Sequence, residues 1–298
     1  MHNIRRPVLV GDDGSAAGRA AVLFAAEEAA LRRAPLRIVH VLDVVHGPTL
    51  PVGGHELEAA AALAFLADSA AVARPVLRRD VTTETAYGRP AAELFARAAE
   101  ADLLVVGRGQ AGVFGLMLGS VALSAATHAP CPVAVVAEAG APGVRGTVVV
   151  GVDDQEHATE ALDIAFAAAE DRAARLVALH AWHYPHGSPA VAVGPLMYDP
   201  AIFARSEARV LHEAVRPYRE KYPDVDVEER TVAGGAAHAL VEASEEAGLL
   251  VVGTRGHGAM HGTVLGSVSL AAIRHAHCPV LVARAHAAGG EWARAAGA

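Results

Sequence analysis

The sequence predicts an α/β protein built from two tandem domains, each a doubly wound parallel sheet of five strands. Three observations support this fold class. The chain has 298 residues, which matches two domains of about 150 residues each. One glycine-rich sequence occurs twice, once in each half of the chain. Short aliphatic runs alternate with longer helical stretches, as buried parallel strands and their crossover helices require.

Each half of the chain shows the same order of elements. In the first half we expect strands at 8–10, 36–42, 81–85, 103–106 and 133–136, and helices at 16–33, 56–74 and 91–100. In the second half we expect a strand and turn at 148–153, strands at 176–181, 225–232, 249–252 and 280–283, and helices at 158–172, 202–218 and 236–246. A further helix is expected after a Gly-Ser pair in each half.

These elements place the first domain at 1–139 and the second domain at 147–285. The segment 140–146 between them is rich in glycine and proline, a composition that suits a linker. The tail at 286–298 has little apolar pattern, so we expect it to be frayed.

The last strand of each repeat, at 133–136 and at 280–283, is short, aliphatic and almost uncharged. An open sheet leaves edge strands whose backbone groups must be paired or covered. We therefore expect these two strands to pair antiparallel with each other. Such pairing would make the chain an internal pseudo-dimer of its two repeats.

The composition excludes several classes of function. The net charge is −8 and no basic run is present, whereas nucleic-acid binding needs clustered cations. No stretch reaches the roughly 18 apolar residues of a membrane span, and the apolar run near the N-terminus is too short for a signal peptide. We therefore expect no membrane partner and a cytoplasmic location.

Cys131 and Cys278 occupy equivalent places in the two repeats and are expected to be buried, reduced thiols.

The repeated glycine-rich sequence has the order of parts that holds an anion on backbone N–H groups: an apolar strand, a glycine-rich loop, a Gly-Ser pair and a helix. Glycines let the backbone approach a phosphate, and the serine at the helix start adds a hydroxyl and unpaired N–H groups. We therefore expect a phosphate site in each repeat. The first copy comprises Gly107, Arg108, Gly109, Gly119, Ser120 and Val121, and the second comprises Gly253, Thr254, Arg255, Gly256, Gly266, Ser267 and Val268.

The turns after the first strand of each repeat are expected to complete these sites. In an open parallel sheet, ligands bind at the carboxyl ends of the strands, near the switch in strand order. The turn in the first repeat carries Gly11 and Asp13, and the turn in the second carries Gly151 and Asp153. We expect these groups to lie beside the glycine-rich loops.

Two other nucleotide motifs fit the glycines less well. A dinucleotide motif of the form Gly-x-Gly-x-x-Gly needs an acidic residue about 20 positions further on. Here the glycines follow the fourth strand of each repeat and lack that residue. A Walker P-loop needs a lysine after its glycines, and the one lysine of the chain, Lys221, lies far from both loops.

Metal and acid–base sites are also disfavoured. His180, His183 and His186 have regular spacing, but they lie at a strand end and in a variable loop, whereas zinc needs groups that converge from fixed positions. Asp12 and Asp13 are neighbours on a turn and are expected to point apart. We therefore expect neither a zinc site nor a paired acid–base role.

Taken together, these motifs resemble those of the universal stress protein family in its tandem two-domain form, over about residues 5–285. The family's nucleotide signature is Gly, two residues, Gly, nine residues, and then Gly-Ser or Gly-Thr. The second repeat fits this signature in full from Gly253 to Ser267. In the first repeat the turn from Gly107 to Gly109 is one residue shorter.

The resemblance implies further site residues. The family's first-strand aspartate, which lies near the adenine and ribose, matches Asp13 and Asp153. The main chain that reads the adenine edge corresponds to Val41 and Ala181. Residues expected to complete the phosphate loops are Gly112 in the first repeat and His257 and Gly258 in the second.

The resemblance also implies the ligand and the role. The ligand is ATP, or else ADP or AMP, with Mg²⁺ held by the phosphates, and the protein is a regulator or sensor of the stress response with a regulatory protein partner. No general base or arginine finger is recognisable, so we expect no fast hydrolysis. Two alternative functions stay open: an enzyme of the same superfamily that forms an adenylate or hydrolyses ATP slowly, and a nucleotide-free interaction protein. A homodimer of the whole chain also stays open, in addition to the internal pseudo-dimer.

The shorter turn in the first repeat predicts unequal sites, with the second repeat binding nucleotide more tightly. One lost hydrogen bond to a charged group costs about 1.5–3 kcal/mol, or roughly ten- to a hundredfold in affinity. Gly266→Glu should remove the tighter phase of binding and Gly119→Glu the weaker phase, because each places a carboxylate in a phosphate site. Calorimetric titration of both variants with nucleotide checks this, and equal losses would contradict the asymmetry.

Overall fold

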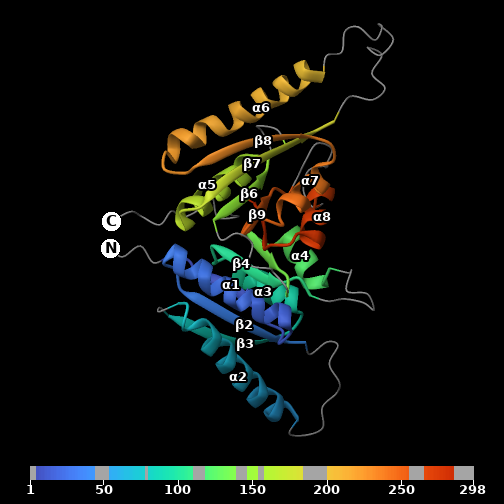
Figure 1. Ribbon diagram of the computed structural model, residues 1–298. Helices are drawn as coiled ribbons and strands as arrows, with labels where there is room; N and C mark the ends of the chain where they lie inside the picture. The colour runs from blue at the N-terminus through green and yellow to red at the C-terminus, as the bar shows by residue number, and fades with distance from the viewer. Residues whose placement is uncertain are drawn as a thin grey trace.

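A computed structural model of the chain describes residues 5–43, 54–77, 80–109, 118–138, 146–153, 158–183, 200–254 and 265–284. The strands are β1 (Val8–Gly11), β2 (Leu36–Leu42), β3 (Val81–Tyr87), β4 (Leu103–Gly107), β5 (Val133–Val136), β6 (Thr147–Gly151), β7 (Arg175–Trp182), β8 (Val227–Ala233), β9 (Leu249–Val252) and β10 (Val280–Val282). They form one ten-stranded sheet in the order β3-β2-β1-β4-β5-β10-β9-β6-β7-β8 (Figure 1). The two repeats therefore lie side by side, with β5 and β10 at the centre.

Neighbouring strands within each repeat are parallel, and the strand order switches between β1 and β4 and between β6 and β9. The two repeats join where β10 pairs antiparallel with β5, in a register that places Leu281 opposite Ala134. The expected pairing of the last strands is thereby confirmed. Each of the two strands covers the edge that the other would leave open.

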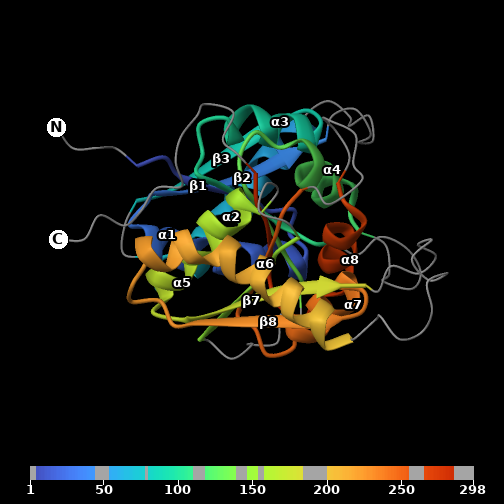
Figure 2. The ribbon, with the colours of Figure 1, turned by 90° about the horizontal axis from the view of Figure 1, so that it is seen from above.

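The helices are α1 (Ala16–Arg32), α2 (Gly54–Ala73), α3 (Pro90–Ala98), α4 (Ser120–His128), α5 (Thr159–Arg172), α6 (Pro200–Lys221), α7 (Ala236–Ala243) and α8 (Ser267–His275). Helices α1, α2, α5 and α6 pack on one face of the sheet, and α3, α4, α7 and α8 pack on the other face (Figure 2). The sheet is therefore buried on both sides, as a doubly wound fold requires.

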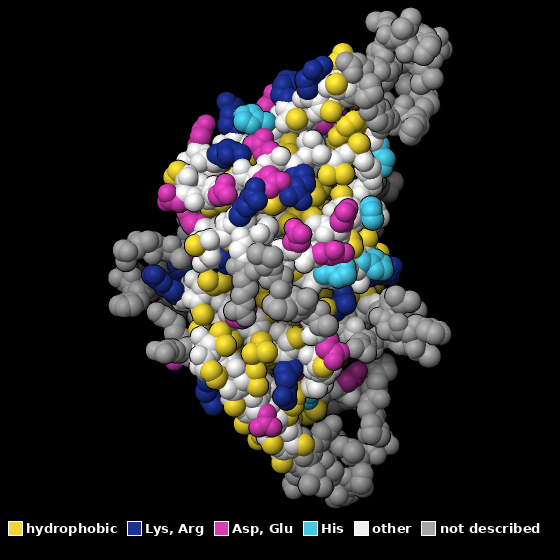
Figure 3. Space-filling view, viewed as in Figure 1, with side chains coloured by type: hydrophobic (Ala, Val, Ile, Leu, Met, Phe, Trp, Pro, Cys, Tyr) yellow, Lys and Arg dark blue, Asp and Glu magenta, His cyan; other side chains and the backbone are white. Residues whose placement is uncertain are grey.

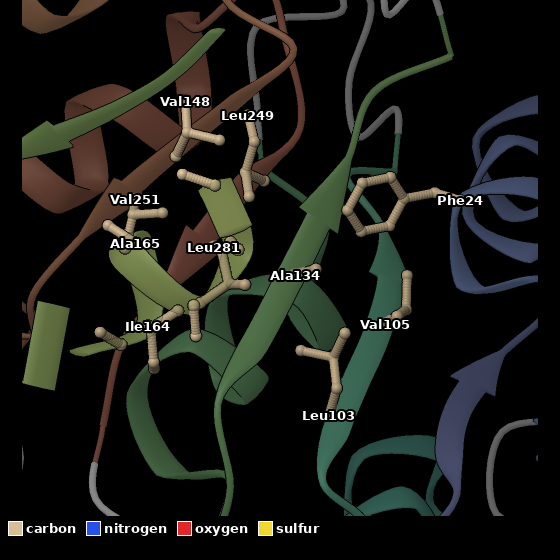
Figure 4. Close-up of a cluster of buried hydrophobic side chains, with 14 of the residues drawn as sticks. Phe24, Leu103, Val105, Ala134, Val148, Ile164, Ala165, Leu249, Val251 and Leu281 are labelled. Atoms are coloured by element: carbon tan, nitrogen blue, oxygen red, sulfur yellow. The ribbon is translucent and has the colours of Figure 1, made fainter. Parts of the chain in front are cut away.

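The aliphatic strands supply both layers of the core. Along β4, Leu103 and Val105 face the α1 side, whereas Leu104 and Val106 face the α4 side, because successive side chains of a strand alternate. Figure 4 shows that Val105 of the first repeat and Leu281 of the second belong to the same buried cluster. The core on the α1 side therefore continues across the junction between the repeats.

Several elements end one to three residues away from their expected limits. Helix α3 begins at Pro90, one residue earlier than expected, because proline has a helical φ and the first turn needs no intrahelical N–H. Strand β8 begins two residues later than expected. Val225 lies before it in a turn, where its N–H donates to the Tyr222 carbonyl at 3.3 Å. Such ends depend on local hydrogen bonds that the periodic pattern does not encode.

The equivalent helices α2 and α6 present different surfaces to solvent, mainly hydrophobic on α2 and strongly charged on α6 (Figure 3). Leu63 on α2 is 65% exposed. On α6, Arg209 pairs with Glu213 at 3.2 Å, and Arg219 pairs with Glu229 of β8 at 3.0 Å. The fold constrains the inner faces of the two helices and leaves their outer faces free to differ.

A buried ion cluster joins α1 of the first repeat to α5 of the second. Glu28 is 1% exposed, and its carboxylate accepts hydrogen bonds from Arg32 on its own helix and from Arg172 on α5. Burial lowers the pKa of each arginine to about 10, which leaves both charged at neutral pH. Arg32 and Arg172 are the last residues of their helices. One carboxylate therefore bridges two equivalent positions across the pseudo-twofold axis.

Replacing Glu28 should destabilise the whole chain. Glu28→Gln should lower the free energy of unfolding by about 3–5 kcal/mol, the usual cost of removing one partner from a buried ion pair. The neighbouring Glu27 is exposed, so Glu27→Gln is a matched control that should change stability by less than about 0.5 kcal/mol. Chemical denaturation measures both variants. A Glu28→Gln protein as stable as the parent contradicts the bridging role.

Candidate functional site

The carboxyl ends of β1, β2 and β4 meet at one edge of the sheet. Gly11, the last residue of β1, lies opposite Val39 of β2 and Val106 of β4. The turn after β1 and the loop after β4 therefore adjoin at the switch in strand order, and β6, β7 and β9 repeat the arrangement around Gly151. The edge carries the expected residues Gly11, Asp13, Val41, Gly107, Arg108 and Gly109 in the first repeat and Gly151, Asp153, Ala181, Gly253 and Thr254 in the second.

One backbone hydrogen bond closes the glycine-rich loop in each repeat. The Gly119 N–H donates to the Arg108 carbonyl, and the Gly266 N–H donates to the Thr254 carbonyl, both at 3.0 Å. Gly109 has a φ of 69°, a conformation that favours glycine. Although the loops differ in length by one residue, the same closing bond holds the start of α4 and the start of α8.

Helices α4 and α8 each begin with a glycine N-cap, which has no side chain to bond the first turn. The next residues, Ser120 and Ser267, are exposed and are followed by the half-buried Val121 and Val268. The N–H groups of a first helical turn have no intrahelical partner, and the helix dipole adds a positive potential there. Both helix starts therefore present the groups that bind an anion.

Gly107 is required by packing. A Cβ at this position would lie 2.8 Å from the carbonyl carbon of Ala17 and 2.9 Å from the nitrogen of Gly18. The first turn of α1 therefore sits directly against the end of β4. This close approach brings the start of α1 next to the glycine-rich loop, and it accounts for the glycine without any ligand.

The two aspartates after β1 occupy different environments. Asp12 is 5% exposed and accepts hydrogen bonds from the Gly14 N–H at 3.0 Å and from the Ser69 hydroxyl at 2.7 Å. Asp13 is exposed and accepts a hydrogen bond from the Ser15 N–H at 3.0 Å. Each carboxylate is thus held by its own donors. One is built into the protein interior, and the other stands at the sheet edge.

The sequence did not predict the two side chains, one on α2 and one on β2, that bond Asp12 and so hold the turn after β1. Ser69 comes from α2 and His40 from β2, where the His40 Nδ1 lies 2.7 Å from the Asp12 carbonyl oxygen. A comparison of the two repeats contains the signal that could have revealed them. The second repeat has the buried Val152 where the first repeat has Asp12, so a charged residue occupies a core position.

Arg108 belongs to the first glycine-rich loop, yet its side chain reaches the second repeat. Its guanidinium donates to the carbonyls of Arg274 and Ala276 at the C-terminal end of α8, at 3.1 and 3.3 Å. Burial lowers the pKa of Arg108. In the opposite direction, Arg284 of the second repeat donates to two carbonyls at the C-terminal end of α4, at 2.6 and 2.7 Å. Each arginine places its charge where the helix dipole is negative.

The two cysteines are buried and free, as expected, and burial raises the pKa of each thiol to about 12. Among the residues that the structure describes, no three His, Cys, Asp or Glu side chains are placed to hold a metal ion. Within the same ranges, no helix combines the length and hydrophobicity that would let it cross a membrane. The expected site residues Gly112, Arg255, Gly256, His257 and Gly258 lie outside the described residues.

Comparison with known proteins finds one family over both repeats. The Universal stress protein family matches residues 5–137 and 145–284. Universal stress protein Rv2005c of Mycobacterium tuberculosis is 33% identical over 291 residues, which cover 93% of this chain and 96% of the relative. A universal stress protein from Archaeoglobus fulgidus has the same fold, with a TM-score of 0.71 at 18% identity over 93% of this chain and 98% of its own. A universal stress protein solved in complex with cAMP is 31% identical over 47% of this chain and 96% of its own, with a TM-score of 0.34.

The raised thiol pKa values predict slow modification of the native cysteines. At pH 8, a thiol with a pKa of about 12 carries roughly a thousandfold less thiolate than one with the ordinary value of 9.0. A disulfide reagent should therefore label Cys131 and Cys278 rapidly in denaturant and more than about a hundredfold more slowly in the native chain. Equal rates in the two states contradict this prediction.

The same raised thiol pKa values should lower the free energy of unfolding above pH 9, because unfolded thiols release protons there while native thiols retain them.

Proposed function

Because the chain belongs to the universal stress protein family, we propose that each repeat binds an adenine nucleotide and that the protein acts as a regulator or sensor in the stress response. The observation that carries this proposal is the shared loop geometry. In each repeat a closed glycine-rich loop leads into a helix with no side-chain cap, beside the turn after the first strand. Backbone N–H groups in such a place suit phosphate.

We assign each group of residues at the sheet edge to one part of the nucleotide. The phosphates are assigned to the glycine-rich loops and to the first turns of α4 and α8. The exposed Asp13 and its counterpart Asp153 are assigned to the ribose side, and the main chain of Val41 and Ala181 to the adenine edge. We assign ATP as the ligand, with ADP and AMP as alternatives, and Mg²⁺ to the phosphate oxygens.

Among the residues that the structure describes, the placement of two basic side chains suits a regulatory role better than fast catalysis. The guanidinium of Arg108 donates its hydrogen bonds to carbonyls at the C-terminal end of α8 and not toward the glycine-rich loop. Lys221 pairs with Asp163 at 2.8 Å, on helices that lie away from both loops. Rapid phosphoryl transfer needs a positioned water and cations on the transferring group. An adenylate-forming or slowly hydrolysing enzyme of the same superfamily is the alternative.

In this proposal the two nucleotide-binding domains are residues 1–139 and 147–285. Of the linker at 140–146 only Gly146 is among the described residues, and the tail at 286–298 lies outside them. The pairing of β5 with β10 makes the single chain a pseudo-dimer. We place the protein in the cytoplasm and infer that it acts through a regulatory protein partner.

Nucleotide binding is tested on protein that is purified without added ligand. We expect mass spectrometry to detect a co-purified adenine nucleotide and calorimetry to detect ATP binding. The double variant Gly119→Glu/Gly266→Glu should bind at least about a hundredfold more weakly. Gly146→Glu is the matched control, because it adds one of the same charges where a Cβ would meet nothing within 4 Å, and it should bind as the parent does.

A steady-state ATPase assay on the same protein separates the regulator from the enzyme. We expect a turnover below about 1 per second, under the usual range for enzymes. A higher turnover would favour the enzymatic alternative. Absence of both co-purified nucleotide and calorimetric heat would contradict nucleotide binding and favour an interaction protein.

A further inference from the structure

Asp12 has a buried carboxyl group and directly follows the aliphatic strand β1. Burying a carboxylate is costly unless hydrogen bonds replace its water. Both oxygens of Asp12 have such partners: Oδ1 accepts from the Gly14 N–H at 3.0 Å, and Oδ2 accepts from the Ser69 hydroxyl at 2.7 Å. Ser69 lies on α2 and is itself 6% exposed. The pair therefore ties the turn after β1 to a helix that lies behind it.

The same turn is enclosed by two further side chains. The His40 ring lies 2.7 Å from the Asp12 carbonyl oxygen through Nδ1, and its centroid is 4.8 Å from that of Phe65 on α2. A Cβ on Gly14 would lie 3.4 Å from the Phe65 ring. The backbone from Asp12 to Gly14 is thus held by β2 and α2 together, and Asp13 stands in the middle of it.

The second repeat provides an internal comparison, because its backbone is held in the same way. The Asp12 N–H donates to Val39 at 3.0 Å, and the Val152 N–H donates to Leu179 at 2.9 Å. His180 Nδ1 lies 2.8 Å from the Val152 carbonyl oxygen, just as His40 does from Asp12.

The side chains behind the turn nevertheless differ between the repeats. Counting from the buried Leu66 of α2 and Leu211 of α6, the position of Ser69 corresponds to Ala214, which is 5% exposed. The carboxylate and hydroxyl of the first repeat are therefore replaced by Val152 and Ala214. The second repeat instead links the histidine behind its turn to α6, where His180 Nε2 lies 3.1 Å from Glu207 Oε2. The Asp12–Ser69 pair is therefore a feature of the first repeat and not a requirement of the shared fold.

We propose that Asp12 and Ser69 are positioning residues that hold Asp13 in place for the nucleoside part of the ligand in the first repeat. This inference rests on the proposed function. Asp12 bonds the residue after Asp13 and anchors it to α2, so the turn is fixed before the ligand arrives. Preorganisation of this kind raises affinity because less conformational freedom is lost on binding. The second repeat forms its site without it.

The test uses the full chain with the second site closed by Gly266→Glu, so that calorimetry with ATP reports on the first site. Ser69→Ala should weaken binding on the order of tenfold, the equivalent of one hydrogen bond to a charged group. In the opposite background, with Gly119→Glu closing the first site, Ser69→Ala should leave ATP binding unchanged. The double variant Asp12→Val/Ser69→Ala carries the residues of the second repeat and keeps the packing apolar. It should weaken binding at least as much as Ser69→Ala, because it also removes the bond from the Gly14 N–H.

A double-mutant cycle with Asp13→Ala shows whether the pair acts through Asp13. We expect Ser69→Ala to have no further effect on ATP affinity once Asp13 is removed. An equal loss with and without Asp13, or no loss in either, would overturn the positioning role while leaving nucleotide binding intact. If the first site binds no ATP and the second site does, the positioning role also fails. If neither site binds ATP, the proposed function fails with it.

Discussion

The antiparallel pairing of β5 with β10 is the contact on which the rest of the architecture depends. Without it, each five-stranded sheet would end in a short aliphatic edge, whose free backbone groups can pair with any available strand. The pairing satisfies these groups within one chain, with Leu281 opposite Ala134. It also carries the buried cluster on the α1 side from one repeat into the other, so the two halves share a core.

Side-chain hydrogen bonds also join the two repeats on both faces of the sheet. Arg108 bonds the end of α8, Arg284 bonds the end of α4, and Glu28 receives Arg172. Helix α8 thereby touches both candidate sites. Its N-terminus forms part of the second site, and its C-terminus is bonded by a residue of the first glycine-rich loop. The pairing of β5 with β10 makes this arrangement possible, because it places α4 and α8 on the same face of one continuous sheet.

The two repeats share backbone geometry more closely than side chains. The closing bond of the glycine-rich loop has the same length in both, although the loops differ by one residue. The side chains around that backbone differ: the second repeat has Ser269, whose hydroxyl bonds the Gly253 carbonyl at 2.6 Å, where the first has Ala122. Backbone N–H groups can bind phosphate whatever the side chains are. The side chains are therefore free to make the two sites unequal.

The sequence by itself determined the order of strands and helices, the two repeats, the pairing of the last strands and the position of both glycine-rich loops. The elements, the repeats and the loops follow from local patterns, either the period of the aliphatic residues or the spacing of glycines before a helix. The strand pairing follows from the need to cover the open edge that each sheet would otherwise leave. The sequence also predicted that the loops after the first and fourth strands adjoin, because a parallel sheet with a switch in strand order brings these two strands together.

Only the tertiary structure decided what the individual side chains do. Ser69 lies 57 residues from Asp12 in the chain and becomes its partner because α2 packs beside α1 and against β2 and β3. Arg108 stands in a loop suited to phosphate, yet it bonds carbonyls of the other repeat. Gly107 is a glycine because the first turn of α1 packs against it. Such contacts join elements that are distant in sequence, and no local period or spacing encodes them.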